Sequence, residues 1–278
     1  MELVVRTHVP EPFDWERPHQ IAARLGAALA SAGKGRVVWL DDPTMLVDAQ
    51  RSDPDLLVYD VNALAPGFQA AAEAADLVFT GGRSLQRAVS TIRPDAECFA
   101  SGVDAAHFAA AAAARSRPVT GRRRPVAGYA GTVDDRLDEE LLQSLAAALP
   151  EWEIEVVEPA SYSDLPAVLA GFDVGLLPFV LDARTPSLSP SKALEYLAAG
   201  LPVVATAMPD VADAFSDVVA LTEGGLGFAA ACERVRDDDA ESRAARAQPL
   251  LRWHDWGAIV DRMARVITKR MRAALAAV

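Results

Sequence analysis

Short apolar runs alternate along most of the chain with segments in which apolar residues recur at helical spacing. Runs rich in Val, Leu and Phe indicate strands buried on both faces, as in a parallel sheet. Their repeated alternation with helical patterns predicts βα units. The predicted strands are ELVVRT, RVVWLD, LLVYDV, DLVFTG and ECFASG in the first half, and VAGYAG, WEIEVVE, DVGLLPF, PVVATA and VVALTE in the second.

The segment Arg115–Pro125, RSRPVTGRRRP, interrupts this alternation. Five arginines are interleaved there with Pro and Gly, and no apolar period survives. We therefore predict two α/β domains, at 1–114 and 125–252, joined by a linker at 115–124. The alanine-rich stretch Ala105–Ala114 before the linker predicts a short helix, because alanine has the highest helix propensity.

The last segment, 253–278, predicts one amphipathic helix. Its apolar positions recur at helical spacing, and basic residues occupy the other faces and the C-terminal end, where cations suit the helix dipole. Such a helix can lie on an anionic membrane surface. Packing of its apolar side on a domain, including a return to the N-terminal domain, is the favoured interpretation.

Composition and charge favour a soluble globular protein. Of the 278 residues, 51% are hydrophobic and 24% are charged, and 27 Lys and Arg against 39 Asp and Glu give a net charge of −12. This acidic balance argues against nucleic acid as the main partner. The N-terminus lacks a signal-peptide pattern and no run of about 18 apolar residues occurs, so we expect a cytoplasmic location. Cys98 and Cys232 lie in apolar surroundings without a Cys/His cluster, which predicts buried thiols.

The segment SPSKALEYLAAG predicts a helix that begins at a ligand-binding edge. Ser189 or Ser191 can cap it, Pro190 suits its first turn and Gly200 can end it. The helix follows the strand DVGLLPF, and ligands of open α/β sheets bind beyond the carboxyl ends of strands. Free N–H groups at the helix start would therefore face a ligand there and suit a phosphate.

Lys192 and Glu195 give this helix start its charges. Lys192 adds a cation to the anion site, and Glu195 lies three residues on, on the same face. A carboxylate one turn deeper is placed to accept hydrogen bonds from two sugar hydroxyls. The alternative is a capped helix with an ordinary Lys/Glu pair.

A glycine-containing loop, GYAGTVDDRLD, follows the first strand of the second domain and leads to a helix at about Leu137. Gly131 lets the backbone approach a ligand closely, and Asp134 or Asp135 can cap the helix. The loop is neither GxGxxG nor a P-loop, so by itself it does not identify a phosphate site.

Several motifs, taken in order, resemble those of family-four retaining glycosyltransferases of the GT-B fold. They are ASGVDAAHF, VAGYAGTVDDRLDEELL, FDVGLLPF, SPSKALEYLAAGLPVVAT and the terminal WHDWGAIVDRM, and DWERPHQIAARL is similar to the opening segment of one bacterial branch. The resemblance covers most of the chain. It implies two Rossmann-like parallel-sheet domains that face each other across a cleft, with a C-terminal helix closing the structure.

The resemblance also implies a function: transfer of a sugar, with retention, from a nucleoside diphosphate sugar to an unidentified acceptor, in a hexosyltransferase-type reaction. The C-terminal domain would bind the donor, with Glu195 at its ribose, and the N-terminal domain the acceptor. No metal ion or other cofactor is implied, because helix dipoles and basic side chains stabilise the leaving diphosphate. The donor-binding residues implied or proposed are Gly131, Thr132, Arg136, Arg184, Ser189, Ser191, Lys192 and Glu195.

The chain departs from the family pattern at two charged positions. Ser187 replaces the usual first glutamate, and Thr132 follows Gly131 where the family has a basic loop. Arg136 or Arg184 could supply the missing charge, because arginine binds phosphate in bidentate fashion. The departures favour an alternative function, a non-catalytic pseudo-glycosyltransferase that binds a nucleotide sugar or a partner protein. A sugar-nucleotide epimerase is less consistent, because no cluster of catalytic acids is visible.

Two histidines are the candidate catalytic residues. His8 ends the first strand and His19 begins the helix RPHQIAARL, so either could assist the acceptor. His107, in SGVDAAHF, is interpreted as structural. No Ser/His/Asp arrangement is recognisable, so hydrolase chemistry has no support. The oligomeric state is left open.

Overall fold

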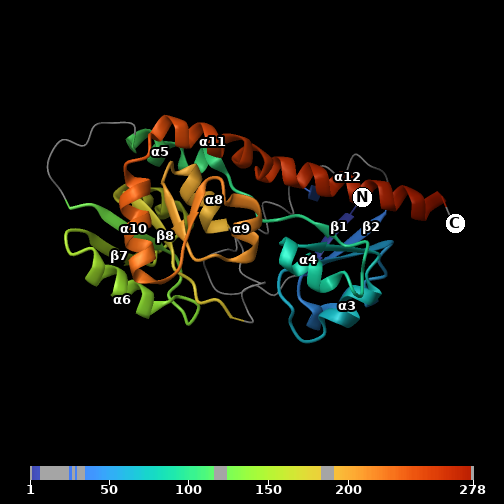
Figure 1. The fold of residues 1–278 in the computed structure, drawn as a ribbon. Coiled ribbons are helices and arrows are strands. Elements are labelled where there is room, and N and C mark those ends of the chain that lie inside the picture. Colours follow the sequence, from blue (N-terminus) through green and yellow to red (C-terminus); the bar gives the residue numbers. More distant parts are fainter. Residues whose placement is uncertain are drawn as a thin grey trace. The chain divides into compact units, whose positions relative to one another are not determined.

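A computed structural model describes residues 2–6, 25–26, 29, 35–115, 124–182 and 191–276. Tertiary contacts divide the chain into two compact units (Figure 1). Unit 1 comprises Met1–Ser101 and Trp256–Val278, and unit 2 comprises Gly102–Asp255.

The division after Ser101 differs from the predicted boundary at 114/115. Residues 105–115 fold into helices whose Phe108 and Ala111 are buried in the core of unit 2. Their packing assigns this segment to the second unit. Residues 116–123 of the predicted linker lie outside the described residues.

Unit 1 is built on a five-stranded parallel sheet in the order β1-β2-β3-β4-β5. The register pairs Val37 with Leu56 and Val58 with Leu77. Each strand predicted in the first half of the chain is confirmed. The strands are β1 (Glu2–Arg6), β2 (Arg36–Leu40), β3 (Leu56–Val61), β4 (Leu77–Thr80) and β5 (Glu97–Cys98).

Two apolar clusters cover the two faces of the unit 1 sheet. The described helices of this unit include η1 (Pro43–Met45), α2 (Leu46–Arg51), α3 (Phe68–Ala74), α4 (Arg83–Val89) and α12 (Trp256–Ala276). Val38 and Leu40 belong to a cluster with residues of α2, α3 and α4, whereas Val37 and Trp39 belong to a cluster with α12. Alternate strand residues point to opposite faces, so both faces of the sheet are buried.

The C-terminal helix α12 packs its apolar side on the sheet of unit 1. Ile259, Met263 and Ile267 are buried there, in agreement with the helical spacing of the sequence. The helix begins at Trp256 rather than at the predicted residue 253, because α11 (Ala240–Trp253) runs up to that point. Within the part of the chain that is described, no helix has the length and apolar character needed to cross a membrane.

Unit 2 contains a second five-stranded parallel sheet, in the order β10-β9-β8-β6-β7. Its central strands are buried along their whole length, as continuous apolar runs predict. The predicted strands of the second half are likewise confirmed. They are β6 (Val126–Ala130), β7 (Glu153–Val157), β8 (Val174–Leu177), β9 (Val203–Ala205) and β10 (Val219–Leu221).

The strand order of unit 2 reverses beside β6. Besides α11, the helices are η2 (Ala105–Phe108), α5 (Ala109–Arg115), α6 (Glu139–Ala148), η3 (Tyr162–Asp164), α7 (Leu165–Gly171), α8 (Ser191–Ala198), α9 (Pro209–Phe215) and α10 (Gly224–Arg236). The chain passes from β6 to β7 and then returns to β8 on the other side of β6. Because parallel crossovers are right-handed, the reversal places α6 and α7 on opposite faces. Helix α6 packs with α10, whereas α7 packs with α5. The gap between β6 and β8 is thus a topological switch point, where open α/β sheets bind ligands.

Helix α8 ends at the glycine that the sequence indicated. Gly200 has φ +74°, a conformation that favours glycine. Its N–H donates to Leu197 O at 3.0 Å, and the Leu201 N–H donates to Tyr196 O at 2.9 Å. These are the two bonds of a Schellman motif, which turns the chain toward β9.

Candidate functional site

Strands β6 and β8 separate at the carboxyl edge of the unit 2 sheet. Their last paired residues are Gly128 and Gly175, whereas β6 pairs with β7 as far as Ala130. The next N–H, that of Gly131, donates to Val157 O at 2.9 Å and so points toward β7. Successive residues of a strand direct their N–H groups to opposite sides. The Ala130 N–H therefore points toward β8, beyond the last pair of the two strands.

The hydroxyl of Tyr196, on α8, occupies this gap. The Ala130 N–H donates to it at 2.7 Å, and the hydroxyl donates to Ala130 O at 3.3 Å. Gly175 makes room for the ring, because a Cβ at that position would collide with Tyr196 Cδ2. Burial raises the pKa of Tyr196 well above its usual value, so the hydroxyl keeps its proton. Tyr196 thus joins α8 to the end of β6.

Lys192 lies one turn before Tyr196 and reaches the same peptide. Its Nζ donates to Ala130 O at 3.1 Å and lies 5.5 Å from the centroid of the Tyr129 ring, within cation–π range. Gly131, with φ +156°, provides the space, because a Cβ there would collide with Lys192 Nζ. Gly131 and Lys192, both predicted from sequence, are therefore neighbours in the structure.

Tyr129 and Thr132 define the first turn of the loop that follows β6. The Tyr129 hydroxyl donates to Thr132 O at 2.9 Å, and its ring packs edge-on against Phe179 with centroids 5.8 Å apart. Burial, reinforced by the charge of Asp134, raises the pKa of Tyr129 to about 12. The hydroxyl is therefore protonated at neutral pH and holds the turn in place as a donor.

Arg136 is paired within this loop. Its Nε lies 2.9 Å from both carboxylate oxygens of Asp134, and this contact raises the pKa of Arg136. The predicted cap of the helix that follows is wrong. Asp138, rather than Asp134 or Asp135, caps α6, because its carboxylate accepts from the Leu141 N–H at 2.9 Å.

Glu195 lies one turn deeper in α8 than Lys192 and is only 4% exposed. Glutamate is rarely buried to this extent unless a polar group pairs with it. Ser191, at the start of α8, and Lys192 are half-buried. The helix therefore presents a hydroxyl, an ammonium and a carboxylate in order from its start inward.

The structure brings together Gly131 and Lys192 near the switch point. Glu195 lies one turn further along α8, and Thr132 and Arg136 lie on the loop after β6. The predicted residues His8, His19, Arg184 and Ser189, together with Ser187, lie outside the described residues. Tyr129 and Tyr196 were not predicted as site residues from the sequence. A signal was present in Gly175, because a glycine inside a buried strand marks a close approach by another group.

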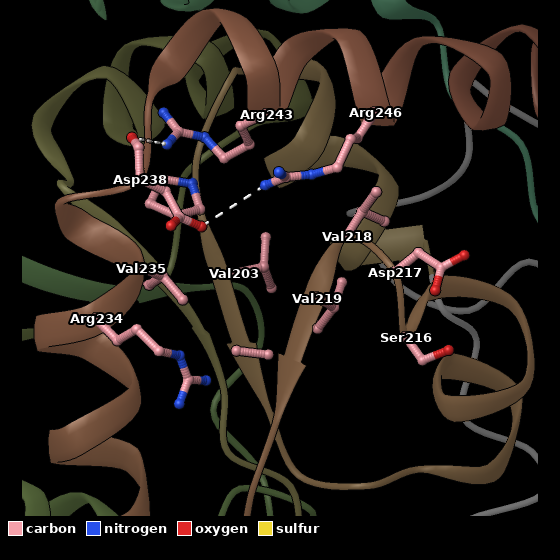
Figure 2. A pocket seen from close by; sticks show the side chains of 12 residues that line it. Val203, Ser216, Asp217, Val218, Val219, Arg234, Val235, Asp238, Arg243 and Arg246 are labelled. Atoms are coloured by element: carbon pink, nitrogen blue, oxygen red, sulfur yellow. Dashed lines mark hydrogen bonds and ion pairs between the residues drawn. The ribbon is translucent and has the colours of Figure 1, made fainter.

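A separate pocket lies at the opposite, amino edge of the unit 2 sheet (Figure 2). It has a volume of about 170 Å³, and Arg243 and Arg246 of α11 line it beside Asp238. The Arg243 guanidinium donates to Asp238 O at 3.0 Å and to Gly200 O at 3.2 Å, and Arg246 lies 3.7 Å from the Asp238 carboxylate. These contacts hold the corner between α10 and α11 against the end of α8, which gives the two arginines a structural role.

Unit 1 carries a half-buried carboxyl group near the carboxyl edge of its own sheet. Asp60 lies near the end of β3, and Asp41 follows the end of β2. Burial and the charge of Asp41 raise the pKa of Asp60 to about 7, and a hydrogen bond with Asn62 opposes the shift. Asp60 is therefore partly protonated at neutral pH. No local pattern around Asp60 indicates this property.

Comparison with known sequences places the chain in one family. The profile of the family described as glycosyl transferases group 1 matches residues 106–246, which is half of the chain. A Bacillus subtilis (strain 168) protein named as a teichuronic acid biosynthesis glycosyltransferase, TuaH, is 26% identical over 187 residues, which are 57% of this chain and 47% of that protein. The chain thus matches about half the length of this relative.

Solved structures show the fold. A sucrose-phosphate synthase from Thermosynechococcus elongatus has a TM-score of 0.61 at 15% identity, covering 96% of this chain and 81% of its own. HepE from Anabaena, solved in complex with UDP and glucose, has a TM-score of 0.62 at 15% identity, covering 96% and 85%. Both match nearly the whole chain, with its two parallel-sheet units. The chain therefore belongs to the group 1 glycosyl transferases and has the GT-B fold.

Proposed function

We propose that the chain is a retaining glycosyltransferase that transfers a hexosyl group from a nucleoside diphosphate sugar to an acceptor hydroxyl. Membership of the group 1 family supports the transferase class. The observation that carries the proposal is the convergence of Lys192, the start of α8 and the Gly131 loop at the switch point of unit 2. This is the edge of the sheet at which α/β proteins bind phosphates.

The diphosphate of the donor would bind at the start of α8. Departure of a nucleoside diphosphate builds negative charge on its phosphate oxygens, and fixed donors that already point there lower the barrier. Lys192 would turn from Ala130 O to a phosphate oxygen, where both partners carry a charge. Ser191 and the N–H groups of the first turn would add donors. This scheme uses no metal ion and no further cofactor.

The donor ribose would bind one turn deeper, at Glu195. Its carboxylate can accept hydrogen bonds from two vicinal hydroxyls. Because Glu195 is shielded from water, such bonds would meet less competition than on the surface. The order of phosphate and then ribose along α8 follows from the spacing of Lys192 and Glu195.

Unit 1 is proposed to bind the acceptor. His8 and His19, which lie outside the described residues, are proposed to assist the acceptor hydroxyl. Arg184 and Ser189, also outside them, are proposed as further donor-site residues, with Arg184 or Arg136 replacing the missing loop cation.

A second candidate function is a non-catalytic protein that binds a nucleotide sugar. The observation that favours it is the pairing of Arg136 with Asp134. The pairing neutralises the nearest arginine that could have replaced the basic residues of the family loop. A site with less positive charge can hold a donor without stabilising the departing diphosphate.

Titration calorimetry with UDP, GDP, ADP, CDP and dTDP and their sugars tests these functions. UDP comes first, because HepE of the same fold was solved with it. We expect one diphosphate to bind, and its sugar to be hydrolysed slowly, with an increase in turnover when the acceptor is supplied. Retention is read from the anomeric configuration of the product by NMR. Binding without any turnover supports the non-catalytic alternative, and no binding of any diphosphate rejects both.

A further inference from the structure

We propose that Tyr196 is a positioning residue for the donor, whose hydroxyl holds the Ala130 peptide in place when Lys192 turns to a diphosphate. The proposal rests on the proposed function and assigns a role to a side chain outside the predicted site. Its basis is the shared acceptor: Lys192 Nζ lies 3.1 Å from Ala130 O, and the Tyr196 hydroxyl lies 3.3 Å from the same oxygen.

The shared carbonyl matters because Lys192 must leave it in order to bind a phosphate oxygen. Ala130 is fully buried, and a buried carbonyl without a hydrogen bond carries a large desolvation penalty. The Tyr196 hydroxyl remains as a donor after Lys192 departs. The change of partner by Lys192 therefore leaves no unsatisfied group behind, and donor binding does not have to offset such a penalty.

The same hydroxyl fixes the Ala130 N–H, which has no strand partner because β6 and β8 have separated. One side chain thus holds both polar groups of the residue immediately before Gly131. The ring itself is fixed by Gly175, whose missing Cβ leaves the space that the ring occupies. A loop that approaches a phosphate by its backbone must be held within a fraction of an ångström, and Tyr196 meets that need.

A different result is expected if the role of Tyr196 is purely structural. In that case Tyr196 fills space between α8 and the sheet, and loss of its hydroxyl lowers stability without changing the affinity for a diphosphate. A matched comparison exists in the same sheet. The Thr206 hydroxyl accepts from the Phe179 N–H at 3.2 Å and donates to Leu177 O at 3.3 Å, so it makes the same two kinds of bond between β8 and β9.

The test compares Tyr196→Phe with Thr206→Val. Each variant keeps most of the side-chain volume and removes one buried hydroxyl with its accepted and donated bonds. Three measurements are made: the melting temperature, amide hydrogen exchange by NMR, and the Kd of the diphosphate that binds the wild-type chain, beginning with UDP. Lys192→Met and the double variant Lys192→Met/Tyr196→Phe complete a cycle.

We expect Tyr196→Phe to accelerate exchange at the Ala130 amide and to weaken diphosphate binding about fivefold to tenfold, the scale of one buried hydrogen bond. Tyr196→Phe and Thr206→Val should lower the melting temperature by similar amounts. Thr206→Val should leave the Kd within about twofold of wild type. In the Lys192→Met background, Tyr196→Phe should change the Kd by less than it does in the wild-type background, because no ammonium is left to turn and only the fixing of the Ala130 N–H remains.

Three results would overturn the proposal while the proposed function stands. They are an unchanged Kd for Tyr196→Phe, an equal loss of affinity in Thr206→Val, and a Tyr196→Phe effect that persists in full beside Lys192→Met. A wild-type chain that binds none of the diphosphates overturns the proposed function, and this proposal falls with it. The two failures are therefore distinguishable by the wild-type titration alone.

Discussion

The ammonium of Lys192 lies in the space that a side chain at Gly131 would fill. The two residues are 61 positions apart in sequence, on α8 and on the loop that follows β6. Their contact places a cation against backbone that has no side chain of its own. We propose that this arrangement serves a charged, phosphate-bearing ligand, so that Gly131 is as important to the proposed site as the lysine.

Replacement of Gly131 by alanine should weaken diphosphate binding. The new Cβ would meet Lys192 Nζ, and alanine tolerates φ +156° poorly, so both the ammonium and the loop must move. We expect at least about a tenfold increase in Kd, measured by calorimetry. Gly171→Ala is the control, because a Cβ at Gly171 has no atom within 4 Å. Equal binding by both variants would show that the Gly131 loop does not contact the ligand.

Arg243 and Arg246 should contribute to stability rather than to donor binding. Arg243→Met removes the bonds to Gly200 O and Asp238 O, and we expect the free energy of unfolding to fall by about 1–3 kcal/mol in urea titrations. Arg246→Gln, which loses only an exposed pair at 3.7 Å, should cost less than about 1 kcal/mol. Both variants should retain the wild-type Kd for a diphosphate. A selective loss of affinity in either would assign the pocket of Figure 2 to the donor site.

Asp60 should make unit 1 less stable as the pH rises. Its pKa is about 7 in the folded chain, against about 4 for an unperturbed aspartate. Between those values the folded chain holds a proton that the unfolded chain has lost, so the free energy of unfolding falls as the pH rises. Between about pH 5 and about pH 8, the free energy of unfolding measured in urea should fall by about 2 kcal/mol less in Asp60→Asn than in wild type. Parallel pH profiles for the two proteins would contradict this assignment.

Cys232 should resist thiol reagents in the folded chain. It is fully buried, and burial, with a smaller effect of Glu233, raises its pKa to about 12. The reactive thiolate is therefore scarce at neutral pH. Mass spectrometry after brief labelling should find Cys98, which is half-buried, modified ahead of Cys232. Modification of Cys232 at the faster rate would show that the core of unit 2 opens readily.

The sequence predicted the sheets well because parallel strands buried on both faces leave continuous apolar runs. Every strand was found, and the apolar spacing of α12 matched the face that packs on unit 1. Boundaries were predicted less well. The alanine-rich segment 105–114 carries no sign of the core it joins. The aspartates near the start of α6 are alike as caps until the start of the helix at Glu139 is known, which makes Asp138 the cap.

Only part of the candidate site was predicted, because only some of its features are local in sequence. Lys192 and Gly131 follow from the chemistry of a helix start and of a glycine loop, which are local features. The role of Tyr196 depends on the separation of β6 from β8, which leaves the Ala130 N–H without a strand partner. That separation is a property of the sheet, and no local pattern in the helix encodes it.

Helix α8 is proposed to bind a diphosphate at Lys192 and a ribose at Glu195. The most direct measurement is a calorimetric comparison of UDP, UMP and 2′,3′-dideoxy-UDP, or their equivalents for the base that binds, with wild type, Lys192→Met and Glu195→Gln. Lys192→Met should lose the preference for the diphosphate over the monophosphate. Glu195→Gln should keep that preference and lose the preference for the ribose over the dideoxyribose. Wild-type preferences in both variants would contradict the account.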